Sequence, residues 1–260
     1  MLATRVIPTL LLKNGGLYKG IKFRNHKYVG DPINTIKLFN DKEVDELVVL
    51  DITASIESRG PDFELITEMA SEAFMPMAYG GGLRKKEDAD RVFSVGFEKI
   101  VVSTSLYEAP DFVAHTCKKY GSQSVVASID YSRSRFGFKS PVVFARCGTK
   151  KQRLGPQEAA RRAVDLGAGE ILLNCIDRDG TMSGYDLELL ADVANGVDVP
   201  VIASGGAASI DDFVMAKHNH ASAVAAGAMF VYQGPHRAVL IQYPAYRDLE
   251  NALGDSVKEE

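Results

Sequence analysis

Eight short apolar runs recur along the chain, and stretches with helical character separate them. The runs are "RVIPTLLL" (5–12), "ELVVLDI" (46–52), "MPMAYGG" (75–81), "KIVVST" (99–104), "SVVASID" (124–130), "EILLNCI" (170–176), "PVIASGG" (200–206) and "AVAAG" (223–227). Each is nearly continuously apolar, which is typical of parallel strands covered on both faces. Eight strands that alternate with helices predict an α/β fold of the (β/α)8 barrel type, with an open doubly wound sheet as the alternative.

The stretches between the runs carry helix start and stop signals. Four of them are "DPINTIKLFND" (31–41), "LRKKEDADRVFSVG" (83–96), "GPQEAARRAVDLG" (155–167) and "SIDDFVMAKHN" (209–219). In the third, Pro156 falls in the first predicted turn and Gly167 follows the last, an order that favours a helix between them.

The two halves of the sequence resemble each other. A strand ending in glycines, a helix and a strand ending in small residues occur in "AYGGGLRKKEDADRVFSVGFEKIVVSTSL" and again in "ASGGAASIDDFVMAKHNHASAVAAGAMF". Gly82 and Ser103 are 21 positions apart, as are Gly206 and Gly227, and the offset between the halves is 206 − 82 = 124. This repeat predicts a barrel duplicated from two half-barrels. We expect one domain over residues 1–260.

Composition narrows the class of protein. Of the 260 residues, 46% are hydrophobic and 25% charged, and the net charge is −4, which gives no general attraction to nucleic acid or to an anionic membrane. The three cysteines and five histidines show no metal-ligand or disulfide spacing. Without a signal peptide or an apolar stretch of membrane-spanning length, we expect a cytoplasmic protein with no metal and no cofactor.

The strand ends predict a phosphate-binding face. Glycine turns at 80–82 and 205–206 would expose backbone N–H groups at helix starts, beside the small residues at 103–105 and 227–229. Two such cradles suit an elongated ligand with a phosphate at each end. The alternative is that the glycines only allow tight turns.

Carboxylates and lysines fall at the same predicted edge. Asp51, Asp130, Asp177 and Asp179 follow strands and are candidate acids or bases, with loop capping as the alternative, which is stronger for Asp177 and Asp179. Lys13 and Lys19 lie on a predicted long first loop. They would either cover an anionic substrate as a lid or form a solvated basic face.

Four charges stand at the opposite ends of the strands. Arg5, Glu46, Lys99 and Glu170 each precede an apolar run. The residue pattern alone favours ordinary charges at the starts of strands, because paired charges inside a barrel floor are expensive to desolvate. The alternative is an inward-facing ring of two cations and two anions.

Several segments resemble a known family over nearly the whole chain. They are "MLATRVIP", "DELVVLDITASIE", "YGGGLR", "GSQSVVASID", "GAGEILLNCIDRDGTMSGYD" and "PVIASGGA", and they are similar to the cyclase subunit of imidazole glycerol phosphate synthase, the HisF type. The resemblance implies a duplicated (β/α)8 barrel that forms a heterodimer with a glutaminase (HisH-like) subunit docked on its bottom face. Ammonia from that subunit would react with a bis-phosphorylated ribonucleotide to give imidazole glycerol phosphate and a purine precursor.

The resemblance also implies roles for individual residues. Arg5, Glu46, Lys99 and Glu170 would form an ammonia gate, which reverses the interpretation from pattern alone, and Glu98 would contact the partner. Phosphate and substrate binding would fall to Lys19, Gly82, Ser103, Thr104, Gly180, Gly206, Gly227 and Ala228.

The first strand departs from the family pattern. That family uses two aspartates, at the ends of the first and fifth strands; Asp130 matches the fifth, but Leu11 occupies the first. Leucine cannot transfer a proton, and one acid or base group typically contributes about 10² to 10⁴-fold in rate. Asp51 and Asp179 would remain as polar groups at the top of the barrel.

Leu11 therefore predicts a paralogue that keeps ammonia delivery and phosphate binding for another acceptor. Similar proteins occur in surface-polysaccharide pathways, where a HisF-like barrel and a glutaminase supply ammonia to a sugar amidotransferase that makes an acetamidino sugar from an acetamido sugar. Two alternatives are a histidine-pathway cyclase that tolerates Leu11 and a non-catalytic activator of the glutaminase.

Overall fold

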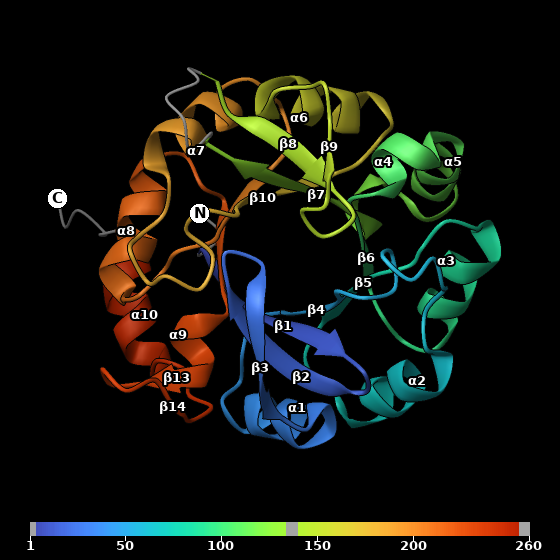
Figure 1. Cartoon of the computed structure of the whole chain (residues 1–260). Helices are drawn as coiled ribbons and strands as arrows, with labels where there is room; N and C mark the ends of the chain where they lie inside the picture. The colour runs from blue at the N-terminus through green and yellow to red at the C-terminus, as the bar shows by residue number, and fades with distance from the viewer. Residues whose placement is uncertain (1–3, 134–139, 255–260) are drawn as a thin grey trace, which may run out of the picture.

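The computed structural model describes residues 4–133 and 140–254, and eight of its strands close into a parallel barrel (Figure 1). In order around the barrel they are β1 Arg5–Lys13, β4 Leu47–Asp51, β5 Met77–Gly80, β6 Lys99–Val102, β7 Val125–Ser132, β10 Glu170–Cys175, β11 Val201–Ser204 and β12 Ala223–Ala226. Pairing of β12 with β1 and of β7 with β10 completes the ring. The predicted (β/α)8 barrel is confirmed, and each of the eight apolar runs supplies one barrel strand.

Helices surround the barrel and cover the outer face of the strands (Figure 1). The longer ones are α1 Pro32–Asp41, α2 Phe63–Glu72, α3 Lys86–Ser94, α5 Pro110–Tyr120, α6 Pro156–Asp165, α7 Leu187–Ala194, α8 Ile210–His218 and α10 Tyr246–Leu253. Two of the predicted helices begin as expected: Asp31 accepts a hydrogen bond from the Asn34 N–H at the start of α1, and Pro156 opens α6.

The two halves match in a further detail. The short helix α4 Ser105–Glu108 follows β6, and the short helix α9 Ala228–Val231 follows β12. Thus the same strand–short helix unit occurs at the two places that the sequence repeat relates. A 3₁₀ turn, η1 Ser122–Ser124, precedes β7.

Apolar side chains pack in two layers, one on each side of the strands. The outer layer fills the space between strands and helices. The inner layer draws on every barrel strand, and its members are Ile7, Val48, Ala78, Val101, Val126, Leu172, Ile202, Ala223 and Ala225. Apolar side chains from every barrel strand therefore line the middle of the barrel interior.

Strand β1 shows how the alternation places side chains. Leu10 and Leu12 belong to the outer layer, whereas Leu11 lines a cavity at the end of the barrel and is paired in register with Leu50 of β4. The three consecutive leucines therefore face two different environments, as the two-residue period of a strand requires.

The predicted long first loop is wrong, because residues 16–30 form a β-hairpin. Strand β2 Gly16–Ile21 pairs with β1 and with β3 Arg24–Gly30. Gly15 forms the turn between β1 and β2 with a φ of +74°, whereas Gly16 makes room for a ring: a Cβ at Gly16 would lie 2.8 Å from Cε2 of Tyr28.

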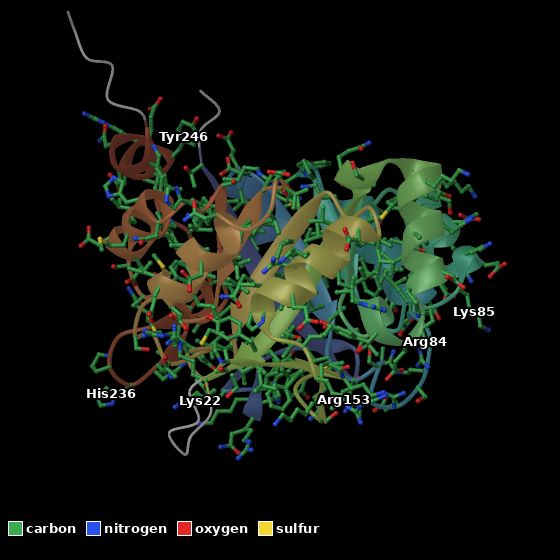
Figure 2. The ribbon with its side chains drawn as sticks, turned by 90° about the horizontal axis from the view of Figure 1, so that it is seen from above. Lys22, Arg84, Lys85, Arg153, His236 and Tyr246 are labelled. Atoms are coloured by element: carbon green, nitrogen blue, oxygen red, sulfur yellow. The ribbon has the colours of Figure 1, made fainter. Side chains whose placement is uncertain are left out.

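The remaining strands are short and lie outside the barrel. A second hairpin, β8 Val142–Ala145 with β9 Lys150–Lys151, extends from β7, and β13 Tyr232–Gln233 pairs with β14 Ala238–Val239. Lys22 and Arg153 lie at one end of the barrel and Tyr246 at the other (Figure 2). None of the helices in the described ranges has the length and apolar character needed to cross a membrane.

The alternation in β1 yields a stability prediction. Leu12→Ala should lower the free energy of unfolding by about 2–5 kcal/mol, because the 3%-exposed side chain would leave a hole in the outer layer. Leu11→Ala should cost clearly less, because Leu11 already borders a cavity. Urea unfolding of both variants measures the difference, and equal costs would contradict this placement.

Candidate functional site

A cavity of about 330 Å³ opens at the carboxyl ends of the barrel strands. It is lined by the inward-facing strand ends, the βα loops, and residues of the two hairpins that extend from β1 and β7. This is the face on which (β/α)8 barrels place their chemistry. The cavity therefore collects most of the residues that the sequence singled out.

Asp130 is the buried acid of this cavity. Its Oδ1 accepts hydrogen bonds from Asn174 at 3.0 Å and from Ser128 at 3.5 Å, and its Oδ2 accepts one from Ser103 at 3.4 Å. Burial raises the pKa of Asp130 to about 6; the hydrogen bonds lower it, and the neighbouring Asp179 raises it. A carboxyl with this pKa can give or accept a proton near neutral pH.

Leu11 faces the same cavity from β1. It pairs with Leu50, which also lines the cavity, so β1 and β4 present an apolar wall where a first-strand aspartate would project. Asp130 and Asn174 lie on the adjacent strands β7 and β10, which also meet in register. The cavity thus has an apolar side and a polar side.

Lys19 is buried, so a solvated basic face does not describe this residue. It is 5% exposed, and its Nζ donates to Oδ1 of Asp179 at 2.7 Å, while Oδ2 of Asp179 has no hydrogen-bond partner within the described residues. The Lys22 N–H donates to the Asp179 carbonyl at 2.8 Å. These contacts fix the β2–β3 hairpin over the cavity by joining it to the loop after β10.

Asp51 has a different environment from Asp130. Its Oδ1 accepts from the N–H groups of Thr53 and Ala54 and from the Thr53 hydroxyl, each at 3.0 Å, and its Oδ2 lies 2.8 Å from Nη2 of Arg59. The carboxylate holds the loop that follows β4. Its donors already occupy both oxygens, so we regard it as a positioning group.

The glycine turns lie where the predicted cradles require them, and tight packing accounts for several of them. A Cβ at Gly206 would lie 2.1 Å from the Gly184 carbonyl oxygen, and one at Gly180 equally close to the Gly20 carbonyl oxygen. Gly227 differs, because its absent Cβ leaves room for the Lys19 ammonium, whose Nζ would be 3.1 Å away. An anionic group that came close to the backbone at Gly227 would therefore also meet the positive charge of Lys19.

The same cavity receives the other predicted cradle residues. These are Gly82, Ser103, Thr104 and Ala228. The Thr104 hydroxyl accepts from the Arg146 N–H at 3.1 Å, which joins this cradle to the β8–β9 hairpin. Arg146 in turn forms an ion pair with Glu108 at 2.8 Å.

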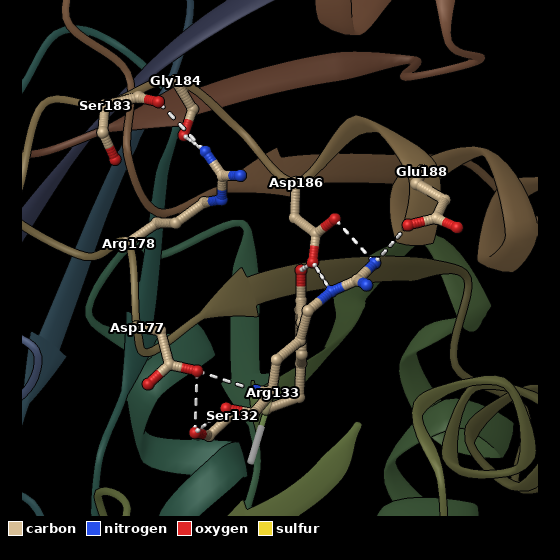
Figure 3. A network of polar contacts seen from close by, with 9 residues as sticks. Ser132, Arg133, Asp177, Arg178, Ser183, Gly184, Asp186 and Glu188 are labelled. Atoms are coloured by element: carbon tan, nitrogen blue, oxygen red, sulfur yellow. Dashed lines mark hydrogen bonds and ion pairs between the residues drawn. The ribbon is translucent and has the colours of Figure 1, made fainter. Parts of the chain in front are cut away.

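The loop after β10 is anchored by a charged network (Figure 3). Asp177 accepts from the Ser132 hydroxyl at 2.8 Å and from the Arg133 N–H at 2.7 Å. The Arg133 guanidinium donates to both oxygens of Asp186, at 2.6 and 2.9 Å, and to Glu188 at 3.0 Å. For Asp177 the loop-capping alternative therefore describes what the carboxylate does.

Four charges meet at the opposite end of the barrel. Arg5 forms ion pairs with Glu46 and Glu170, and Lys99 Nζ lies 3.0 Å from Glu46 and 2.8 Å from Glu170. The four side chains thus make a closed ring of alternating charge. Nearby, the exposed Glu98 accepts a hydrogen bond from the Met77 N–H at 2.7 Å.

The sequence patterns did not identify several polar residues of the cavity, and three of these carry titratable or amide groups. Asn174 contacts Asp130 directly, Cys147 lines the cavity from the β8–β9 hairpin, and His26 lines it from β3. Asn174 occupies a strand end, which could have identified it. His26 and Cys147 lie on hairpins whose folding over the mouth no local pattern indicated.

Comparison with known proteins gives consistent results over nearly the full length. Residues 5–236 match the family described as "Histidine biosynthesis protein". A Pseudomonas aeruginosa protein with the provisional name imidazole glycerol phosphate synthase subunit hisF2 is 49% identical over 96% of this chain and 99% of its own. A provisionally named HisF subunit of Leptospira interrogans is 47% identical, covering 96% and 98%. The imidazole glycerol phosphate synthase subunit HisF of Streptomyces coelicolor is 42% identical, covering 88% and 90%.

The contrast between Asp130 and Asp51 yields a prediction about pH. Asp130 binds its proton more tightly in the folded chain than in the unfolded chain, so its burial costs stability as pH rises from 3.8 to about 6. Asp130→Asn should therefore raise the free energy of unfolding by about 1–3 kcal/mol at pH 7, and the gain should vanish below pH 3.8.

Asp51→Asn is the matched control. It should lower the free energy of unfolding at pH 7 by about 1–3 kcal/mol, because a charged acceptor for two backbone N–H groups and Arg59 is lost. Urea unfolding at pH 3.5, 5 and 7 compares the two variants. Destabilisation by both at pH 7 would contradict the buried-acid description of Asp130.

Proposed function

Because the chain belongs to the histidine biosynthesis protein family, and within it to the HisF type, we propose that it is the ammonia-using subunit of a glutamine-dependent synthase. In this proposal a glutaminase of the HisH type docks on the bottom face, ammonia passes along the barrel axis, and an acceptor receives it at the cavity. The observation that carries the proposal is the arrangement along one axis: a charged ring at one end, an apolar interior, and a cavity with a buried acid at the other.

The ring suits a controlled entrance for ammonia. Its two cations and two anions satisfy one another, so the floor of the barrel is closed without an uncompensated charge. Oε1 of Glu46 is buried without a hydrogen-bond partner in the described part of the chain, which leaves an acceptor free for an entering N–H group. Rearrangement of Lys99 or Arg5 would open the ring.

The apolar layer above the ring favours the neutral form of the cargo. Ammonium would have to lose its hydration among side chains such as Ile7, Val101 and Leu172, at a cost of several kcal/mol. Neutral ammonia avoids that cost. A glutaminase that releases neutral ammonia directly at the floor therefore has an advantage over ammonium taken from bulk water.

The apolar side chain of Leu11 bears on which molecule accepts the ammonia. The carbonyl or imino carbon that ammonia attacks would find Asp130 on one side of the cavity and an apolar wall at Leu11 and Leu50 on the other. We propose that the acceptor is a phosphorylated acetamido sugar of surface-polysaccharide biosynthesis, with a sugar amidotransferase as a second partner. The high identity to the relative named hisF2, a name that indicates more than one HisF-type protein in that organism, supports a paralogue.

A histidine-pathway cyclase is the second candidate. Asp130, Lys19 and the two cradles favour it, because they would bind and protonate a bis-phosphorylated ribonucleotide. The missing first-strand acid argues against it.

An ammonium-driven cyclase assay separates the two candidates. The purified barrel, with ammonium and the bis-phosphorylated ribonucleotide, should turn over at least about 10²-fold more slowly than an ordinary cyclase, since one acid group is lost. Leu11→Asp should restore part of the rate, whereas Leu11→Asn, similar in size but unable to donate as an acid, should not. Ordinary turnover by the natural protein would refute the sugar acceptor and restore the histidine-pathway reaction.

Partner docking is tested separately. Mixed with a HisH-type glutaminase from its own organism, the barrel should form a one-to-one complex and stimulate glutamine hydrolysis. Glu98→Lys, on the bottom face, should weaken the complex about ten-fold by charge reversal at the interface, while Glu68→Lys on the exposed face of α2 should not. Absence of any complex in light scattering would overturn the glutaminase proposal.

A further inference from the structure

The loss of the first-strand acid leaves the question of which groups in the cavity can still exchange a proton. Seven titratable side chains line it: Lys13, Lys19, His26, Asp51, Asp130, Cys147 and Asp179. The contacts of these seven side chains show which of them are already held in ion pairs or hydrogen bonds and which could exchange a proton with a ligand.

Five of them are already engaged or unsuited. Lys19 and Asp179 neutralise each other, and Asp51 is bound by Arg59 and two backbone N–H groups. Lys13 lies over the Tyr18 ring, with Nζ 5.7 Å from its centroid. Burial raises the pKa of the Cys147 thiol to about 12, so it stays protonated. Asp130 and His26 remain.

His26 is held at the cavity by the shape of its hairpin. The pairing of β2 with β3 is irregular between Lys19 and Ile21, and His26 lies across from Gly20 at this point. A Cβ at Gly20 would be 2.9 Å from Cδ2 and 3.1 Å from Nε2 of the imidazole, so the glycine provides the space for the ring. Neither ring nitrogen has a hydrogen-bond partner among the described residues, and the side chain is half-buried.

The groups around His26 keep it neutral. Burial lowers its pKa, the charges of Lys13 and Lys19 lower it further, and Asp179 raises it in part. At pH 7 the imidazole therefore offers a free lone pair, whereas the other four histidines lie outside the cavity lining. Lys19, whose charge acts on His26, also approaches Gly227, so this one lysine connects His26 with the Gly227 cradle.

We propose that His26 contacts the ligand in this cavity and exchanges a proton with it, forming with Asp130 the pair of proton-transferring groups that Leu11 would otherwise leave incomplete. The inference rests on the proposed function, since it assumes that the cavity holds a phosphorylated acceptor. It deepens that function by assigning a second reacting group and by explaining how the site works without a first-strand carboxylate.

The pair suits addition of ammonia to a carbonyl carbon. The ammonia lone pair forms the new C–N bond, and the C=O π pair moves to the oxygen. Asp130 in its protonated form, which a pKa of about 6 leaves as the minor form at pH 7, gives its proton to that oxygen, and His26 takes one proton from the new nitrogen. The adduct is then neutral, with an imidazolium and a carboxylate left in the cavity, which return to their starting forms when one proton passes between them through water.

The first experiment is an NMR titration of the histidine side chains in the full chain, assigned with His26→Gln. The probes are the bis-phosphorylated ribonucleotide and N-acetylglucosamine 1-phosphate, with binding followed independently by calorimetry. A bound phosphate dianion beside the ring should raise the pKa of His26 by about one unit or more and leave that of His218 unchanged.

The variants test the same contact. His26→Gln should weaken binding of the probe about ten-fold or more, as expected for loss of one hydrogen bond to a charged group, and His218→Gln, on the exposed end of α8, should not. His26→Asn serves as a second variant, with the melting temperature of each confirming that it folds.

The outcomes distinguish this inference from the function on which it rests. Binding of a probe with no movement of the His26 signals and no loss of affinity in His26→Gln overturns the role of His26 and leaves the proposed function standing. Binding of neither probe at millimolar concentration overturns the phosphorylated acceptor and, with it, the role of His26.

Discussion

Closure of the parallel sheet is the constraint on which the rest of the molecule depends. Once β12 pairs with β1 and β7 with β10, every second side chain of each strand must point into a space that no solvent reaches from the side. Along β1 this places Arg5 in the charged ring at the floor, Ile7 in the apolar layer, and Leu11 at the cavity. Position along a strand thus decides whether a residue joins the charged ring, the apolar layer or the cavity.

The two ends of the barrel treat buried charge in opposite ways. At the floor, Glu46 and Glu170 share two cations, so the charges compensate one another without help from solvent. At the top, Asp130 has neutral hydrogen-bond donors, and burial without a cation raises its pKa. That difference separates a structural ion-pair ring from a group that can exchange protons, and it costs the folded state stability at neutral pH.

The hairpins extend the site beyond the barrel strands. The β2–β3 hairpin brings Lys19 and His26 over the cavity, and its contacts with Asp179 tie it to the loop after β10. The network of Asp177, Arg133 and Asp186 then fixes that loop to the end of β7. Residues far apart in the sequence therefore share one cavity because these contacts hold the hairpin and the loop in place. This arrangement is what allows the proposal that His26, from the hairpin, supplies a proton-transferring group that β1 lacks.

The sequence alone determined the barrel, since eight apolar runs separated by amphipathic stretches satisfy few other architectures, and it placed Asp130 and Leu11 at strand ends. For the four floor charges the residue pattern favoured ordinary charges at strand starts, and the ring that they form depends on strands that meet only in the closed barrel. It could not show that Gly16 and Gly20 belong to a hairpin, because a glycine that makes room for a ring looks the same in sequence as one that forms a turn. Nor could it separate Asp51 from Asp130, since the donors that hold Asp51 and the burial that perturbs Asp130 arise only when distant strands meet. Local pattern fixes which face of a strand a residue occupies; only the closed tertiary structure decides which groups it meets there.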